Sequence, residues 1–292
     1  MQSALITTFN ARSAEIDLYI QHVLHLAEPD SRQLVEGTGV DHESTQTIQK
    51  MHKASCFLAL YNLVESTARS IVEEISCHIN RDGITVKDLS ATLQRSLIRG
   101  SFKDYQQQRR EEIALVLLEL AYRQDSITCF PNADIKPTSG NVDARWLRSL
   151  AECYGFSVIC GPLARNGADL LTVKSRRNGL AHGNFTFADC GKEYTVDDIR
   201  DIAESTINFL KDIVSNVSTF LAHREFSVTA SFQRLPGLTD EQRASLLARF
   251  REPREVFKAS QAELLTVPGM NTDATAAIVA ESVRLGYNTV GK

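Results

Sequence analysis

A short stretch near the middle of the chain, RRNGLAHGNF from Arg176 to Phe185, concentrates side chains that can act on a phosphate ester. Arg177 offers a permanent positive charge whose forked N–H groups can hold two phosphate oxygens together. His182 follows after four intervening positions, and because histidine titrates near neutral pH it can accept or donate a proton. The pair therefore combines charge stabilisation with proton transfer.

The same stretch predicts a helix that ends at this motif. On a helix, Asn178 and His182 lie one turn apart on the same face, whereas Arg177 and His182 diverge by about 140°. Gly183 is a helix-ending residue type, which would place His182 in the last turn, close to solvent. Asn178 is then a candidate for orienting the ring or the phosphate, and a plain helix-face asparagine is the alternative. For Arg177 and His182, the alternative is a surface arginine beside a hydrogen-bonded histidine.

Two long amphipathic helices are predicted to position the motif. One is expected between residues 45 and 80, where apolar or small side chains recur in steps of three and four, the period of a buried helical stripe. Its stripe consists of Ala54, Phe57, Tyr61, Val64, Ala68, Ile71 and Ile75. The other is expected from Thr195 to about His223, because Thr195 and Asp198 form a T-x-x-D start signal. Two such helices are typical of a helical bundle.

Further segments complete this bundle. A helix is expected up to Pro29, a helical run around residues 110–124, and a helix that ends in the motif. Residues 131–141 are rich in Pro, Gly, Ser and Asn and predict a loop. Segment 81–160 is expected to be an insertion. The sequence therefore predicts an all-α helical bundle with an inserted helical segment over residues 1–228.

Residues 229–292 predict a small domain of a different kind. The tetrapeptides LPGL at Leu235 and VPGM at Val267 recur 32 residues apart, and the apolar positions after them align at the same offset. In each copy a glycine, Gly237 or Gly269, lies in a short turn that opens an amphipathic helix. This pattern resembles a tandem helix-hairpin-helix domain, which presents backbone amides to DNA phosphates.

The hairpin repeats depart from that pattern at their second glycine. Thr239 and Asn271 occupy this position in the two copies, and a side chain there makes close approach to a phosphate harder. From residue 235 to 284 there are six Lys or Arg against seven Asp or Glu, so the segment is nearly neutral. Gly237 and Gly269 remain candidate nucleic-acid contacts, and a structural or protein-docking module is the alternative.

Composition limits the class of protein. Apolar residues make up 43% and charged residues 23% of the chain, which is typical of a globular protein. The net charge of -4 supplies no global attraction to nucleic acid, so any such binding must be local. Six cysteines without a Cys-x-x-Cys pair favour thiols in a reducing compartment. The first residues lack a signal-peptide pattern and no long apolar run is present, so we expect a cytoplasmic protein without a membrane partner.

The spacing of Arg177 and His182 resembles the signature of the HEPN superfamily. Three segments together resemble the HEPN group known as MAE_28990/MAE_18760-like, over roughly residues 1–225. They are FLALYNLVESTARSIVEEI from Phe57, SGNVDARWLRSLAECYGF from Ser139 and RRNGLAHGNFTFADCGKEYTVDDI from Arg176.

This resemblance implies metal-independent RNA cleavage, without a cofactor, at a site built across a symmetric homodimer. Arg177 and His182 would be catalytic, and the 2′-hydroxyl of the RNA would be the nucleophile. The resemblance also implies a toxin-like or defence-related role, with an antitoxin as a candidate partner. One alternative is a non-catalytic adaptor whose C-terminal repeats bind DNA or a protein, and another is a purely structural helical oligomer.

Several further residues are weaker candidates. Glu65 flanks the buried stripe inside YNLVEST and could support the site, with a structural role as the alternative. Arg176 is expected to be a solvated neighbour, and Lys192 is expected in a loop; both are candidate contacts for nucleic acid. His22 and His25 are three residues apart and could share a metal ion, but no third ligand is indicated, so a solvated helix face and no metal site are expected.

Overall fold

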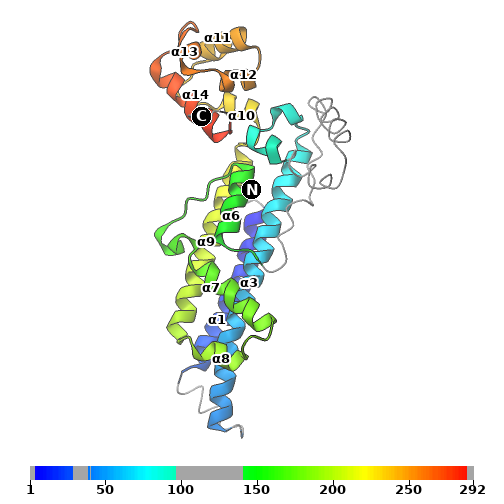
Figure 1. Ribbon diagram of the computed structural model, residues 1–292, viewed down its shortest axis with the longest axis vertical. Coiled ribbons are helices and arrows are strands. Elements are labelled where there is room, and N and C mark those ends of the chain that lie inside the picture. The colour runs from blue at the N-terminus through cyan, green and yellow to red at the C-terminus, as the bar shows by residue number, and fades with distance from the viewer. Residues whose placement is uncertain (1–3, 29–38, 40, 97–140, 288–292) are drawn as a thin grey trace. The chain divides into compact units, whose positions relative to one another are not determined.

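The computed structural model describes residues 4–28, 39, 41–96 and 141–287, which form helices and no strands (Figure 1). The all-α class is therefore confirmed. The helical run expected at 110–124, almost all of the loop expected at 131–141 and the middle of the expected insertion lie outside the described residues.

The chain divides into two compact units. The first unit comprises residues 1–74, 135–149 and 157–218, and the second comprises residues 75–134, 150–156 and 219–292. The candidate motif belongs entirely to the first unit and the hairpin repeats belong to the second. A separate domain that begins at residue 229 stays a prediction.

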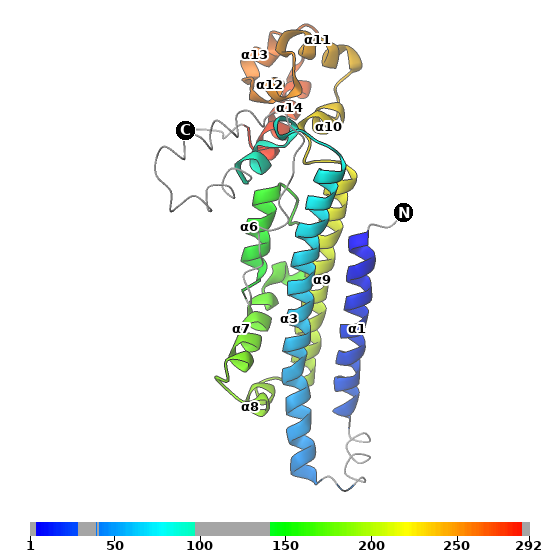
Figure 2. The ribbon, with the colours of Figure 1, turned by 90° about the vertical axis from the view of Figure 1, so that its right-hand side faces the viewer.

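The first unit is a helical bundle. It contains α1 (Ala4–Leu26), most of α3 (His42–Arg81), α7 (Asp169–Ala181) and most of α9 (Val196–Ala222), which run side by side (Figure 2). All four helices and a short fifth one contribute to one buried cluster, as the stripe pattern predicted. Its members are Ile20, Val23, Ala54, Cys56, Phe57, Leu60, Tyr61, Val173, Leu180, Cys190, Ile199, Ile202 and Ala203.

The starts of the two long helices follow from local capping. Before α9, the Thr195 hydroxyl accepts a hydrogen bond from the Asp198 backbone N–H at 3.1 Å, and the Asp198 carboxylate accepts one from the Thr195 N–H at 2.7 Å. Before α3, the Asp41 carboxylate accepts the Ser44 N–H at 2.8 Å. The expected helix from residue 195 and the expected stripe helix are both confirmed within a few residues of their predicted ends.

Shorter elements connect these helices. They are α6 (Ala144–Tyr154), the 3₁₀ segment η3 (Pro162–Gly167) and α8 (Phe187–Lys192). Lys192 was expected in a loop, and this was wrong because it is the last residue of α8. Thr186 caps this helix by accepting the Asp189 N–H at 3.1 Å. A helix of six residues is too short to show a helical period in the sequence.

Gly191 allows α8 to pack directly against the backbone of α3. A Cβ atom at Gly191 would collide with the backbone carbonyl of Lys50, which cannot move aside as a side-chain tip could. We expect Gly191→Ala to lower the free energy of unfolding by about 1–3 kcal/mol or more, measured by chemical denaturation. Gly161→Ala is the matched control, because its Cβ would lie at an ordinary 3.7 Å from the Asp212 carboxylate. Equal stability of the two variants would contradict this packing.

The second unit contains two helical hairpins that follow the 32-residue repeat. The first hairpin joins α10 (Val228–Gln233) to α11 (Asp240–Phe250), and the second joins α13 (Gln261–Leu265) to α14 (Thr272–Arg284). The short helix α12 (Pro253–Lys258) links the two hairpins. The 3₁₀ segment η1 (Val86–Asp88) also belongs to this unit.

The turns of the two hairpins are equivalent. Gly237 and Gly269 have φ angles of 76° and 81°, a region that glycine adopts without strain. Thr239 and Asn271, which replace the second glycine of the usual hairpin, are the N-caps of α11 and α14. Their side chains accept first-turn backbone N–H groups, so helix capping accounts for both residue types.

Candidate functional site

The helix that carries the motif ends at the predicted residue. Gly183 adopts a left-handed φ of 69°, the Asn184 N–H donates to the Gly179 carbonyl at 2.9 Å, and the Gly183 N–H donates to the Leu180 carbonyl at 3.3 Å. These two bonds form a Schellman motif, which terminates an α-helix. His182 is the C-cap of α7 and its side chain is exposed. The predicted place of His182, at the helix end and next to solvent, is therefore confirmed.

The other glycine of the motif has a packing role. Gly179 is buried in α7, and a Cβ atom there would overlap the ring of Phe185. Phe185 lies just after the turn and folds back across this position. The two glycines thus reverse the chain tightly, which leaves His182 at the exposed tip of the turn.

Arg177 is held by two neighbours. Its guanidinium lies over the ring of Tyr61 on α3, at 4.5 Å from the ring centroid, and its Nη1 donates to the side-chain oxygen of Asn178 at 3.0 Å. Asn178 was expected to orient the imidazole or a phosphate. In this structure its amide oxygen accepts this bond from Arg177, and its backbone carbonyl accepts the His182 N–H at 3.0 Å. The expected role of Asn178 stays a prediction.

Tyr61 and the residues just before α6 are buried and form the surroundings of Arg177. Tyr61 is 2% exposed, and its hydroxyl accepts the Val142 backbone N–H at 3.1 Å. The next residue, Asp143, is also buried and accepts a hydrogen bond from Lys174, one turn before Arg177 on α7. These contacts bring α3, α7 and the start of α6 together around Arg177. Sequence reasoning placed Tyr61 in the core stripe but missed its contact with Arg177.

The pKa values of Tyr61 and Asp143 are set by burial and by nearby hydrogen bonds and charges. Burial raises the pKa of the Tyr61 hydroxyl and the charges of Glu65 and Asp143 add to the rise, whereas the Val142 N–H and the Arg177 charge oppose it. Burial alone would also raise the pKa of Asp143. Hydrogen bonds from Lys174 and the Trp146 N–H, with the charges of nearby cations, outweigh burial and hold the pKa of Asp143 below its usual value.

This depressed pKa predicts an acid-dependent loss of stability. Because the folded-state pKa of Asp143 lies below its unfolded value of about 3.8, its contribution is present above that pH and is lost as pH falls through the folded pKa. We expect Asp143→Asn to lower the melting temperature clearly at pH 7. The difference from the parent should shrink as pH is lowered below about 3.8. A difference that stays constant from pH 7 to pH 3 would show that the Asp143 charge contributes nothing.

Arg176 is not the solvated neighbour that was expected. Its Nε donates to the Tyr194 hydroxyl at 2.7 Å and its Nη2 pairs with the Glu193 carboxylate at 2.6 Å. Its guanidinium also lies 5.8 Å from the centroid of the Phe185 ring and 5.2 Å from that of the Tyr194 ring. Arg176 thus fastens the segment after the motif to α7, and this aromatic and acidic environment had no signal in the local spacing.

The remaining candidate residues of the first unit differ in their burial and contacts. Glu65 is half-buried on α3, one turn beyond Tyr61, where its charge acts on the Tyr61 hydroxyl. Lys192 is exposed at the end of α8. His25 pairs with Glu28 at 3.1 Å, and the ring of His22 lies 6.5 Å from that of His52. Among the described residues, no group of three or more His, Cys, Asp or Glu side chains is placed to hold a metal ion.

The hairpin glycines lie in turns that other residues already brace. Arg243 donates to the carbonyls of Leu238 and Leu235, each at 2.9 Å, on either side of Gly237. The Gly269 carbonyl accepts a hydrogen bond from Gln242 at 2.8 Å, which ties the second turn to α11. The carbonyls and the Arg243 charge of these turns are therefore engaged within the unit.

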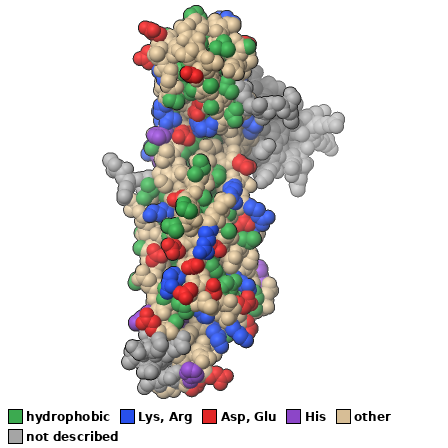
Figure 3. All heavy atoms as spheres, turned by 90° about the vertical axis from the view of Figure 1, so that its left-hand side faces the viewer, with side chains coloured by type: hydrophobic (Ala, Val, Ile, Leu, Met, Phe, Trp, Pro, Cys, Tyr) green, Lys and Arg blue, Asp and Glu red, His purple; other side chains and the backbone are tan. Residues whose placement is uncertain are grey.

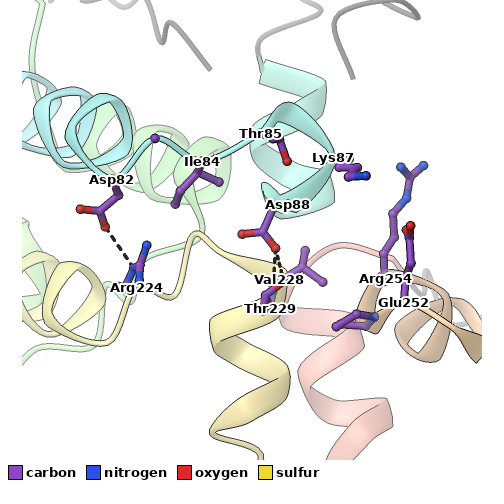
Figure 4. A pocket seen from close by; sticks show the side chains of 12 residues that line it. Asp82, Ile84, Thr85, Lys87, Asp88, Arg224, Val228, Thr229, Glu252 and Arg254 are labelled. Carbon is purple, nitrogen blue, oxygen red and sulfur yellow. Dashed lines mark hydrogen bonds and ion pairs between the residues drawn. The ribbon is translucent and has the colours of Figure 1, made fainter. Parts of the chain in front are cut away.

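A pocket of about 460 Å³ lies within the second unit (Figure 4). Three of its charged side chains have partners within the lining. Arg224 contacts the Asp82 carboxylate at 3.0 Å, and the Asp88 carboxylate accepts the Thr229 N–H at 2.9 Å and the Thr229 hydroxyl at 2.6 Å. The pocket therefore lacks the combination of an oriented arginine and an exposed histidine that marks the end of α7.

Charges of both signs are mixed over the surface. On the face drawn in Figure 3, acidic and basic side chains are interspersed along the described helices. On α9 and beside it, Arg200 pairs with Asp197 and Arg165 pairs with Asp201 at 3.1 Å. These pairs place opposite charges side by side within the first unit. In the described part of the chain, no helix has the length and apolar character needed to cross a membrane.

Comparison with known proteins gives one match. The model of the family described as HEPN_MAE_28990-like HEPN matches residues 1–226, which include α1, α3, α7, α9 and the whole Arg177–His182 motif. No curated protein and no solved structure matches the chain. The family resemblance expected from the three sequence segments is confirmed.

Proposed function

Because the chain belongs to the HEPN_MAE_28990-like HEPN family, we propose that it is a metal-independent endoribonuclease that uses Arg177 and His182. Membership of this family supports a general nuclease role. The observation that carries the specific proposal is the end of α7, where the guanidinium of Arg177 is oriented by Tyr61 and Asn178 while His182 stays exposed.

The proposed reaction is an attack of the RNA 2′-hydroxyl on the adjacent phosphorus. A histidine acting as base removes the 2′-hydroxyl proton, the new bond from O2′ to phosphorus forms, and the bond from phosphorus to O5′ breaks. A second, protonated histidine gives its proton to the leaving O5′. Arg177 stabilises the charge that gathers on the phosphate oxygens. The products are a 2′,3′-cyclic phosphate and a 5′-hydroxyl.

The need for both a base and an acid supports a dimeric site. Each chain supplies one histidine at the motif, His182, so a two-fold homodimer would supply the pair. Sedimentation of the purified protein is expected to show a dimer at micromolar concentration. A monomer that still cleaves RNA would require a different acid.

The direct test of the function is incubation of end-labelled RNA with the purified protein in excess EDTA. Cleavage that persists in the chelator is expected, because no step of the proposed reaction uses a metal ion. Intact RNA in the chelator, with cleavage restored by Mg²⁺, would contradict the proposal.

The second unit is proposed to bind a partner rather than to cleave. Leu265 and Val283 are large apolar side chains that are 45% and 46% exposed on α13 and α14, and the hairpin turns are braced internally. Both observations favour a protein over DNA as that partner. An antitoxin is a candidate for this protein partner, and a role in defence is part of the same proposal.

A further inference from the structure

We propose that Tyr61 is a positioning residue of the cleavage site, which fixes the plane of the Arg177 guanidinium through the face of its ring. This inference rests on the proposed function, since it assigns Tyr61 a part in the same site. Tyr61 acts through Arg177 and takes no part in proton transfer.

Without its neighbours, the Arg177 side chain would be free to change its conformation. A free arginine side chain samples many rotamers, and ordering it costs conformational entropy. The guanidinium carbon of Arg177 lies over the Tyr61 ring, 4.5 Å from the ring centroid, and the Asn178 side chain accepts one N–H at 3.0 Å. A guanidinium carries five N–H groups, so a fork remains for a phosphate once this one is engaged.

The Tyr61 ring is itself held in place by its surroundings. Tyr61 is 2% exposed in the cluster shared by the bundle helices, and the Val142 N–H fixes its hydroxyl at 3.1 Å. Asp143, the next residue, holds α7 through Lys174. The Tyr61 platform and the helix that carries Arg177 are therefore fastened to the same short segment, so the arginine approaches a pre-set surface.

This rigidity affects the reaction because the guanidinium must be placed accurately against the phosphate. A displacement of a catalytic group by about 1 Å can lower a rate by about a hundredfold. Arg177 must meet two oxygens of one phosphate at once, which makes its plane as important as its charge. Without the ring the guanidinium would keep its charge but lose its fixed plane.

The experiment compares Tyr61→Leu, which removes the ring, with Tyr61→Phe, which keeps it. Phe209→Leu is the matched control, because Phe209 is a fully buried aromatic residue of α9 in the same unit. Cleavage is measured in EDTA, and binding is measured with a fluorescent 2′-O-methyl oligoribonucleotide that cannot be cleaved. The Arg177 side chain is observed by NMR in arginine-labelled protein.

We expect Tyr61→Leu to lower kcat about tenfold or more and to weaken binding as much as Arg177→Ala does. Tyr61→Phe should stay within about threefold of the parent, because the stack survives. Phe209→Leu should lower the melting temperature as much as Tyr61→Leu does, with kcat close to that of the parent. The NMR signals of Arg177 should show a ring-current shift that Tyr61→Phe keeps and Tyr61→Leu loses.

Two results would overturn the positioning role. One is the absence of a ring-current shift on Arg177 in the parent protein. The other is a Tyr61→Leu variant that cleaves and binds no worse than Phe209→Leu. If the parent neither cleaves nor binds RNA, the proposed function has failed, and the NMR comparison alone then decides whether Tyr61 fixes Arg177.

Discussion

Replacing His182 by alanine is expected to abolish RNA cleavage while the protein stays folded. The imidazole is the group that would exchange protons with the 2′-hydroxyl and with the leaving oxygen. General acid and base catalysis each contribute about 10² to 10⁴ in rate, so a dimer that lacks both histidines should have no measurable activity. Rates measured in EDTA with labelled RNA check this.

The retained fold is as important as the lost activity. Truncation of a buried, hydrogen-bonded histidine would lower the free energy of unfolding by about 1–3 kcal/mol. His182 is exposed at the C-cap of α7, and the helix end depends on its backbone N–H and on Gly183, both of which the alanine variant keeps. The melting temperature should therefore hardly change.

A second exposed histidine at a helix end provides the control. His223 directly follows α9 and lies 3.5 Å from the Glu225 carboxylate. His223→Ala should cleave RNA at the parental rate. If His182→Ala melts like the parent and also cleaves at that rate, His182 is not catalytic and the adaptor function becomes the better account.

Replacing Arg177 should cause the second-largest loss. Removal of one group that stabilises transition-state charge typically lowers kcat about 10² to 10³-fold, and we expect Arg177→Ala to fall in this range. Arg177→Lys should retain only a minor fraction of activity. Lysine keeps the charge but has no planar fork to hold two phosphate oxygens while it lies over the Tyr61 ring.

Arg200→Ala separates this effect from a general loss of positive charge. Arg200 is exposed on α9 and pairs with Asp197, three residues away on the same helix. Such surface pairs contribute little, so cleavage by this variant should stay within about twofold of the parent. Equal activity of Arg177→Lys and the parent would mean that charge alone suffices and that the fork has no role.

Much of the bundle could be predicted because its signals are local or periodic. The stripe from Ala54 to Ile75 identified α3, and the pair Thr195 and Asp198 identified the start of α9. Gly183 identified the end of α7, because helices commonly end at a residue in the left-handed conformation and that residue is usually glycine. The 32-residue repeat likewise identified equivalent turns at Gly237 and Gly269.

The surroundings of the motif could not be predicted in the same way. Tyr61 and Arg177 are far apart in the sequence, and a stripe tyrosine carries no sign of which cation will lie on its ring. The surroundings of Arg176 depend on how Tyr194 and Phe185 pack after the turn. Tertiary contacts of this kind decide whether an arginine faces solvent or packs on an aromatic ring, and here both Arg176 and Arg177 pack on rings.

His182 and Arg177 are proposed to cleave RNA by internal attack of the 2′-hydroxyl. The most direct measurement is the chemical nature of the product ends after cleavage in EDTA by the parent and by His182→Ala. We expect a 2′,3′-cyclic phosphate and a 5′-hydroxyl from the parent, and intact RNA with His182→Ala. Products with a 5′-phosphate and a 3′-hydroxyl, or the same cyclic product from the folded His182→Ala variant at the parental rate, would contradict it.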